Sequence, residues 1–172
     1  MGPPGTGKNL LARAATAAAR AWLYVLSLEQ TASELNEERF RAVFRRAKES
    51  APSVILIPDL AMMAVSREKG MGDPLDRIVS WLISEMDALE DFSKVVVVGI
   101  THTPGDLEPS LRRRFHREID VSLPDRQGRY ELLRILTKKM PLENDVDLER
   151  LANMTDQFPG VLLLRMCQEA AT

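Results

Sequence analysis

The sequence has little of several features that would place it in a specialised class of protein. Its 172 residues include one cysteine, Cys167, so no disulfide can form within the chain and a reducing compartment, the cytoplasm or the nucleus, is expected. No apolar run is long enough to span a bilayer, and the stretch 95–100 has only the length of a strand. The formal net charge of −2 offers no general attraction for nucleic acid or for an anionic membrane. We therefore expect neither as a partner.

What is present is the composition of a globular domain, since 45% of the residues are apolar. Short apolar runs with the length of buried strands alternate with segments whose apolar residues recur at helical spacing. Strands are predicted at 22–28, 54–57 and 95–100, and helices at 10–21, 39–50 and 78–89. A strand followed by a helix and a second strand favours parallel pairing through a crossover, so the fold class is α/β.

The spacing of apolar residues along the sequence changes near Pro124. Before it, Ile119, Val121 and Leu123 alternate with polar residues, which predicts a half-buried strand. After it, the pattern is helical throughout, with helices predicted at 125–139, 146–154 and 160–171. We therefore predict a large α/β subdomain at 1–124 and a partial helical lid at 125–172.

Residues 2–8 read Gly-Pro-Pro-Gly-Thr-Gly-Lys, which is the spacing of a phosphate-binding loop. Such a loop presents backbone N–H groups to phosphate oxygens, its lysine reaches the terminal phosphates, and a following Ser or Thr holds Mg²⁺. The helix at 10–21 would add its dipole, while the alternative is a chance Gly/Pro-rich loop before a helix. Asn9 replaces the usual hydroxyl residue. The predicted site for ATP or ADP comprises Gly2, Pro3, Pro4, Gly5, Thr6, Gly7, Lys8, Asn9 and Leu10.

Further motifs give the chain a family resemblance. Together with the phosphate loop, these segments make it similar to the AAA ATPase module of the valosin-containing protein type: 52–53, 67–69, 77–80, 86–87, 101–104, 108–113, 114–118 and 124–125. The resemblance implies a P-loop NTPase fold, a parallel sheet flanked by helices. Members of this family hydrolyse ATP as ring hexamers and usually remodel or thread protein substrates. It therefore implies AAA subunits of a homo- or hetero-hexamer as partners, and a possible protein substrate.

The family's metal and base carboxylates are the point of greatest departure. Relatives carry Asp-Glu after the second strand, where the Asp holds Mg²⁺ through water and the Glu polarises the attacking water. Here Pro58 falls at the Asp position and Asp59 at the Glu position, and shifting the register by one still leaves a single carboxylate. Asn9 and Asp59 are the candidate metal ligands, and Asp59 is also the candidate catalytic carboxylate. Hydrolysis and Mg²⁺ affinity are expected to be impaired, and Asp59 is alternatively an ordinary loop-initiating residue.

Three other residues match catalytic positions of the family. His102 stands where relatives place a polar sensor, usually Asn, and its alternative is a satisfied loop residue. Arg114 and Arg117 match the arginines that reach a neighbouring subunit's nucleotide, although two residues before Arg114 are deleted. The alternative for this pair is an exposed basic turn.

The chain also departs from the family pattern in its pore-loop segment and at its two ends. The segment 33–38 is acidic and lacks the aromatic or aliphatic residue with which the family's pore loop grips substrate. In the family a central strand precedes the phosphate loop, whereas here only Met1 does, and the lid stops at Thr172. The module therefore looks truncated at both ends, and the sheet is expected to lack its middle strand.

The sequence-based hypothesis is an AAA module that binds ATP or ADP, with impaired hydrolysis. Three alternatives stay open at this point. The chain could be a non-hydrolysing structural subunit that lends Arg114 and Arg117 to active neighbours, or an active ATPase with unorthodox ligands. It could also be a fragment that does not fold alone.

Overall fold

A computed structural model describes residues 1–27, 37–61, 74–89 and 94–171 of the chain. These residues form two compact units. The first consists of Met1 and Asn9–Ile119, and the second combines Gly2–Lys8 with Asp120–Thr172. The phosphate loop thus groups with the C-terminal helices, and the subdomain limits 1–124 and 125–172 stay a prediction.

The first unit is built on a parallel sheet. Its strands are β1 (Trp22–Val25), β2 (Ser53–Ile57) and β3 (Val95–Gly99), in the order β1-β2-β3. Tyr24 is in register with Ile55, and Ile55 with Val97. Both pairings are parallel, as the strand, helix, strand order predicts. The α/β P-loop class is confirmed.

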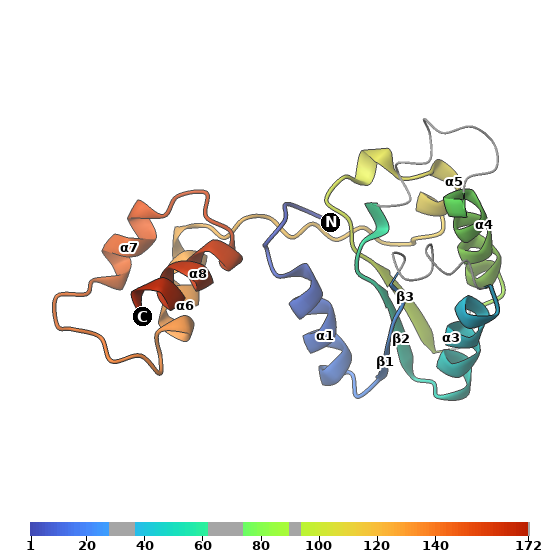
Figure 1. Cartoon of the computed structure of the whole chain (residues 1–172), viewed down its shortest axis with the longest axis horizontal. Helices are drawn as coiled ribbons and strands as arrows, with labels where there is room; N and C mark the ends of the chain where they lie inside the picture. The colour runs from blue at the N-terminus through green and yellow to red at the C-terminus, as the bar shows by residue number, and fades with distance from the viewer. Residues whose placement is uncertain (28–36, 62–73, 90–93, 172) are drawn as a thin grey trace. The chain divides into compact units, whose positions relative to one another are not determined.

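Helices of the first unit cover the sheet on two sides (Figure 1). α3 (Glu37–Glu49) and α4 (Pro74–Asp87) lie together on one side, and α1 (Lys8–Ala18) lies on the other. After β3 come a single 3-10 turn, η2 (Pro104–Asp106), and the short helix α5 (Pro109–Arg112). The first unit's core includes Phe40, Phe44, Ile55, Ile57, Ile78, Leu82 and Leu111.

The central strand β2 is buried along its whole length, whereas β1 is not. The run 22–28 is predicted as a buried strand, but Trp22 remains 66% exposed and Val25 43% exposed. The prediction of a strand is right and the prediction of its burial is wrong, because β1 lies at the edge of the sheet. Residues 26 and 27 follow the strand, and residue 28 lies outside the described residues.

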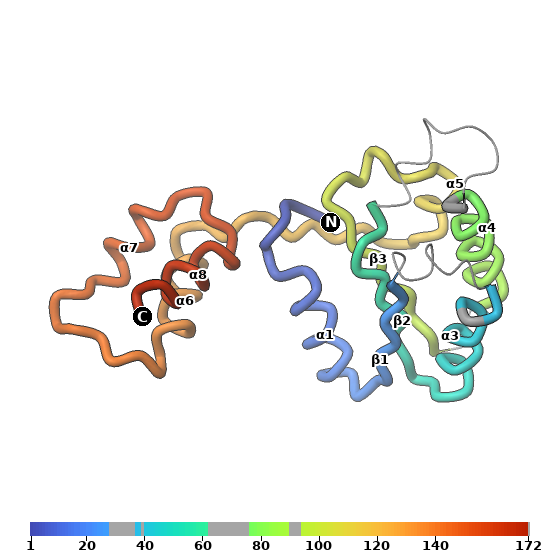
Figure 2. The backbone as a smooth tube through the Cα atoms, viewed as in Figure 1, coloured from blue at the N-terminus to red at the C-terminus, as the bar shows by residue number. Residues whose placement is uncertain are grey.

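The second unit carries three helices, α6 (Arg126–Leu136), α7 (Leu148–Met154) and α8 (Gly160–Ala170). Figure 2 traces the backbone from α6 through a long loop into α7 and back to α8. Their core contains Leu133, Ala152, Leu163 and Cys167. Each of the first two helices begins at an aspartate N-cap: Asp125 accepts from the N–H of Gly128, and Asp147 accepts from the N–H groups of residues 149 and 150.

A buried arginine joins two helices of the second unit. Arg129 is only 5% exposed, and its guanidinium donates to the carbonyl oxygens of Ala152 and Pro124, at 3.0 Å each. Its second terminal nitrogen lies 3.5 Å from a carboxylate oxygen of Asp156. Because a buried guanidinium needs acceptors, these carbonyls fix α6 against the end of α7.

The predicted helices and strands appear with ends shifted by a few residues, except that one predicted strand does not form. Residues 119–123 form no strand, and Ile119 is 67% exposed. A strand needs a neighbouring strand for its backbone hydrogen bonds, and none pairs with this segment in the described part of the chain. The helix predicted to 139 ends at Leu136, where Thr137 donates both its N–H and its hydroxyl to the carbonyl of Leu133.

Membrane crossing finds no support in the helices that the structure describes, because none of them combines the length and the apolar character that a transmembrane span needs. The predicted pore-loop segment falls mostly on 28–36, and the matching segment 67–69 falls within 62–73. Both lie outside the described residues.

Candidate nucleotide site

The phosphate loop Gly2–Lys8 is part of the second unit and ends at Lys8, the first residue of α1. Gly2 and Gly5 have φ values of +131° and +76°, a region that residues with a Cβ rarely adopt. A Cβ on Gly2 would lie 2.1 Å from the carbonyl oxygen of Val121, and one on Gly5 would lie 2.5 Å from Cγ1 of Val161. Glycine is therefore required at these two positions by the φ values and by close packing against residues 121 and 161.

The loop is also tied to the N-terminus of α8. The backbone N–H of Val161 donates to the carbonyl oxygen of Gly5 at 3.2 Å. Within the loop, the hydroxyl of Thr6 donates to the carbonyl oxygen of Pro3 at 2.9 Å. These bonds use carbonyl groups of the loop and leave its N–H groups to serve an anion.

Lys8 is folded back over the loop that it ends. Its ammonium donates to the carbonyl oxygen of Gly2 at 2.7 Å, to that of Pro3, and to the hydroxyl of Thr6 at 3.3 Å. Partial burial lowers the pKa of this ammonium below its ordinary value. The positive charge of Lys8 therefore lies against the loop that it ends.

The first turn of α1 carries the remaining predicted loop residues. Asn9 and Leu10 are both exposed, Leu10 to 72%. The side chain of Asn9 has no hydrogen bond in the described part of the chain. Asn9 is therefore free to turn its amide oxygen toward a ligand.

Asp59 and His102 follow neighbouring strands of the sheet. The chain after β2 is tied to the chain after β3, because Ile100 donates its N–H to Ile57 at 2.9 Å and accepts from the N–H of Leu60 at 2.8 Å. Both side chains are exposed at the carboxyl ends of parallel strands, the edge at which open α/β sheets bind ligands. The first unit thus brings these two predicted residues to one edge.

Thr101 is a residue of this edge that the sequence analysis did not single out. Its side chain is 3% exposed, and its hydroxyl oxygen accepts from the N–H of Thr103 at 3.1 Å. This bond closes the turn that presents His102 to solvent. The sequence indicates this bond, because a Thr side chain readily hydrogen-bonds to the backbone N–H two residues further along the chain.

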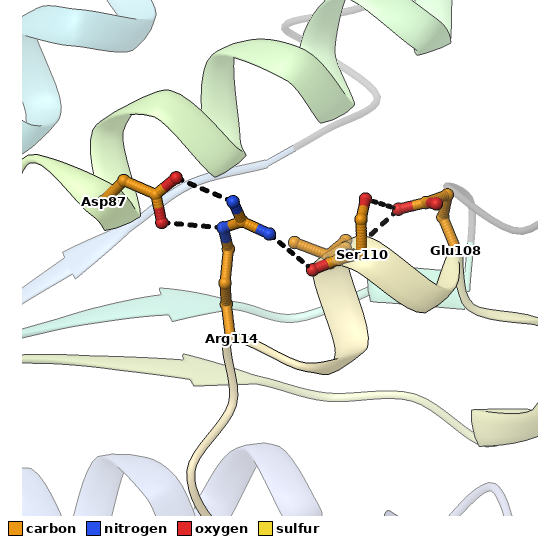
Figure 3. Close-up of polar contacts among 5 residues, drawn as sticks. Asp87, Glu108, Ser110 and Arg114 are labelled. Atoms are coloured by element: carbon orange, nitrogen blue, oxygen red, sulfur yellow. Dashed lines mark hydrogen bonds and ion pairs between the residues drawn. The ribbon is translucent and has the colours of Figure 1, made fainter.

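Arg114 is held by its own chain (Figure 3). Its Nε and Nη2 each donate to a carboxylate oxygen of Asp87 at 2.7 Å, and its Nη1 donates to the carbonyl oxygen of Ser110 at 2.8 Å. The hydrogen bonds from Arg114 lower the pKa of Asp87, and the same bonds raise the pKa of Arg114. This two-pronged pair fixes the guanidinium against the end of α4.

The turn that carries Arg114 is itself braced at α5. Glu108, the N-cap of this helix, accepts from the N–H of Leu111 at 2.9 Å and from the hydroxyl of Ser110. Burial raises the pKa of Glu108, but these hydrogen bonds outweigh it, so the pKa lies below its ordinary value. The carboxylate stays ionised and keeps the turn in place.

The other arginines of the basic segment divide into paired and unpaired side chains. Arg112 makes a two-pronged pair with Glu118, at 2.6 and 2.8 Å. Arg117 is exposed and has no ion pair or hydrogen bond among the residues that the structure describes. Of the two arginines predicted to reach a neighbouring subunit, Arg114 is bound to Asp87 and Ser110 of its own chain. Arg117 has no such partner within the described residues.

The side chains that could serve as metal ligands do not suit tight binding of Mg²⁺. This ion demands near-octahedral oxygen ligands and usually takes one or two carboxylates. Within the described residues no group of three or more His, Cys, Asp or Glu side chains could hold a metal ion. The candidates are one neutral amide, Asn9, and one carboxylate, Asp59, because Pro58 offers no side-chain ligand. We therefore assign no catalytic step to a metal ion.

Sheet and loop together define a class of protein. A parallel α/β sheet, with a glycine-rich loop ending in lysine at a helix N-terminus, is the fold of P-loop nucleotide-binding proteins. The family described as "ATPase family associated with various cellular activities (AAA)" matches residues 1–123. The chain belongs to the AAA family, which supports an ATP-binding module.

One curated relative carries the similarity through nearly the whole chain. The "Cell division cycle protein 48 homolog" of Archaeoglobus fulgidus is 43% identical over 175 residues, which cover 99% of this chain and 24% of the relative. The chain thus spans about a quarter of that relative's length. Together with the family match, this likeness confirms the identification as an AAA module of the valosin-containing protein type.

Proposed function

We propose that this AAA module binds ATP or ADP in the loop Gly2–Lys8 and turns ATP over far more slowly than an AAA ATPase with both carboxylates. The observation that carries the proposal is a glycine-rich loop that ends in Lys8, in a chain with one carboxylate after β2. Glycine is required at two loop positions, and Lys8 lies against the loop that it ends. Pro58 and Asn9 replace the groups that would hold a metal ion.

The size of the expected defect follows from the missing base. Removing a positioned general base typically lowers a rate about 10²-fold to 10⁴-fold. Asp59 is shorter than the Glu of relatives, so its carboxylate stands farther from an attacking water. If slow turnover occurs, Lys8 stabilises phosphate charge, Asp59 orients water and His102 hydrogen-bonds a phosphate oxygen or that water.

A binding and turnover experiment tests this function. Binding of a fluorescent ADP analogue should be lost in Lys8→Ala and kept in Lys139→Ala, which removes an exposed lysine away from the loop. Phosphate release from Mg-ATP should be equally low in the native chain and in Lys8→Ala. Equal analogue binding in all three chains would refute the nucleotide site. Robust release that depends on Lys8 would instead support an active ATPase with unorthodox ligands.

A second function is favoured by the arginines. As a non-hydrolysing subunit of a homo- or hetero-hexameric AAA ring, this chain would lend Arg117 to a neighbour's nucleotide, and Arg114 once it leaves Asp87. An arginine supplied in trans can raise phosphoryl transfer by orders of magnitude, because it neutralises developing charge. Arg117 is exposed and unpaired within the described residues, which supports this role.

Mixing tests the ring function. Adding this chain to an active AAA ATPase of the same type should raise that enzyme's turnover, and Arg117→Ala or Arg114→Ala should remove the gain. Arg112→Ala is the matched control, since Arg112 already pairs with Glu118 and has no proposed role. No change on mixing, or a gain that survives both variants, would refute the role. The same proposal includes a protein substrate on which such a ring would act.

A further inference from the structure

We propose that Phe115 is a positioning residue, which sets where Arg114 and Arg117 stand. Its ring does so by packing in the space that Gly99 leaves beside Leu60 at the end of β3. That the two arginines serve a neighbouring subunit rests on the proposed ring function. The contacts that place them are made within the first unit. Phe115 would act only through the arginines and would not contact a nucleotide itself.

Phe115 is the apolar residue of a charged turn. The segment 112–118 reads Arg-Arg-Arg-Phe-His-Arg-Glu. Phe115 is half-buried and packs against the core of the first unit, whereas residues 116–120 are all exposed. An aromatic ring removed from water stabilises the conformation that buries it, and charged side chains at the surface give no comparable hold. The ring is therefore the side chain that anchors this turn to the core.

The backbone after Phe115 gives the turn little support. The N–H of Phe115 donates to the carbonyl oxygen of Arg112 at 3.1 Å. Residues 116–118 make no backbone–backbone hydrogen bond within the described ranges of the chain. The exposed ion pair of Arg112 with Glu118 is a further tie, but water weakens such pairs. The position of Arg117 therefore depends on the anchored ring two residues before it.

The ring occupies a space that depends on glycine at position 99. A Cβ on Gly99 would lie 3.0 Å from Cζ and 3.2 Å from Cε1 of Phe115, and 2.9 Å from Cδ2 of Leu60. Gly99 has no positive φ, so close packing is what favours glycine there. An added methyl group would overpack the site and displace its neighbours. Leu60 is 2% exposed and Phe115 is half-buried, so the ring has more room to move away.

The ion pair of Arg114 with Asp87 shows where the turn stands (Figure 3). Nε and Nη2 of Arg114 each donate to a carboxylate oxygen at 2.7 Å, and such a two-pronged pair tolerates little displacement. These hydrogen bonds hold the pKa of Asp87 below its ordinary value. Because Arg114 directly precedes Phe115, moving the ring should lengthen both bonds and let the pKa of Asp87 rise.

Titration of the Asp87 carboxyl by NMR in the full chain tests this placement. The pKa of Asp87 should lie below about 3.9 in the native chain and rise toward that value in Phe115→Ala and in Gly99→Ala. Val43→Ala is the matched control, because Val43 packs against the same core from α3. It should lower stability and leave the pKa of Asp87 unchanged. A pKa that stays low in both test variants, or rises equally in Val43→Ala, would overturn the proposal.

A compensating pair of substitutions separates position from loss of folding. Leucine lacks the ring tip that a methyl group at 99 would meet. Phe115→Leu combined with Gly99→Ala should therefore restore the lowered pKa of Asp87. The contact with Leu60 is common to Gly99→Ala and to the double variant, so the difference between them reports on Phe115. A double variant with the same Asp87 pKa as Gly99→Ala would overturn the proposal.

The mixing assay tests the consequence for a neighbouring subunit. Phe115→Ala should lower the gain in the active enzyme's turnover by about tenfold or more, because a misplacement of about 1 Å can cost about 10²-fold in rate. The chain concentration that gives half of the gain should not change. A larger gain than the native chain gives would overturn the proposal, since the ring would then hold the arginines back. No gain from the native chain would refute the ring role alone, because the Asp87 titration needs no neighbour.

Discussion

At the scale of single residues, the pair of Asp87 and Arg114 decides what the basic segment can do. All three guanidinium nitrogens of Arg114 donate within the chain, two of them to Asp87. The pair lies at the surface, where water and salt weaken ion pairs, so its importance lies in orientation. Arg114 must leave Asp87 before it can serve a neighbour.

The pH dependence of stability tests this pair. The pKa of Asp87 is lowered in the folded state, chiefly by its hydrogen bonds from Arg114. A group with a depressed folded pKa contributes stability above its unfolded pKa, about 3.9 for Asp, and loses it as pH falls through the folded pKa. Asp87→Asn should therefore be less stable than the native chain at pH 7, and the two should converge as the pH falls through the lowered folded pKa of Asp87.

Urea unfolding from neutral to acidic pH is the measurement. Asp106→Asn is the matched control, because Asp106 is exposed and its side chain makes no hydrogen bond or ion pair among the described residues. It should keep the native pH profile. A constant stability difference between Asp87→Asn and the native chain at all these pH values would contradict the assigned pKa shift.

The candidate site was predictable where its chemistry is local in sequence. The loop Gly2–Lys8 follows from its spacing, because backbone shape and the lysine are fixed within a few neighbouring residues. The partner of Arg114 did not follow, although Asp87 stands in a segment that resembles the family. Asp87 lies 27 residues away, and the meeting of the two depends on how α4 ends beside α5.

At the scale of elements, helix starts depend on single capping residues. Asp147 accepts from the N–H of Glu149 at 2.9 Å and from that of Arg150 at 3.1 Å, which satisfies two free donors of α7. α7 is only 7 residues long, so it has few hydrogen bonds of its own to rely on.

Removing this cap should destabilise the second unit. We expect Asp147→Ala to lower the free energy of unfolding by about 1 kcal/mol, within a range of roughly 0.5–2 kcal/mol. Faster amide exchange at the start of α7 would show the effect directly. Asp145→Ala is the control, and it should change stability by less than about 0.5 kcal/mol. Equal effects of the two variants would argue against the cap.

Helices and strands were easier to predict than the neighbours with which they pair or pack. The helices that start near Asp125 and Asp147 and the strand β2 follow from local pattern, and the structure confirms them. Residues 119–123 have the alternation of a strand but form none, because a strand also needs a neighbour to pair with. Such a neighbour is a property of the fold, and periodicity within the segment does not reveal it.

At the scale of the whole molecule, the residues that the structure describes form two separate hydrophobic cores. One surrounds Phe44, which is fully buried and stacks on Phe40 with ring centroids 5.5 Å apart. The other surrounds Leu163, which is also fully buried. A chain with two cores is expected to respond to core damage unit by unit.

Truncating each core tests that expectation. Phe44→Ala should cost about 3–5 kcal/mol in the first unit and Leu163→Ala about 2–5 kcal/mol in the second. Amide exchange should accelerate in β2 for the first variant and in α8 for the second. Ile119→Ala, at a side chain that is 67% exposed, should change neither by more than about 0.5 kcal/mol. Exchange that accelerates equally in both units for either variant would contradict two separate cores.

The central claim is that this AAA module holds a nucleotide without an effective metal site. Titrating the full chain with a fluorescent ATP analogue, with and without Mg²⁺, tests it most directly. We predict weak binding whose affinity barely responds to the metal, because Asn9 and Asp59 are the remaining candidate ligands. A large gain in affinity with Mg²⁺ would contradict the account, since it would show that a working metal site survives.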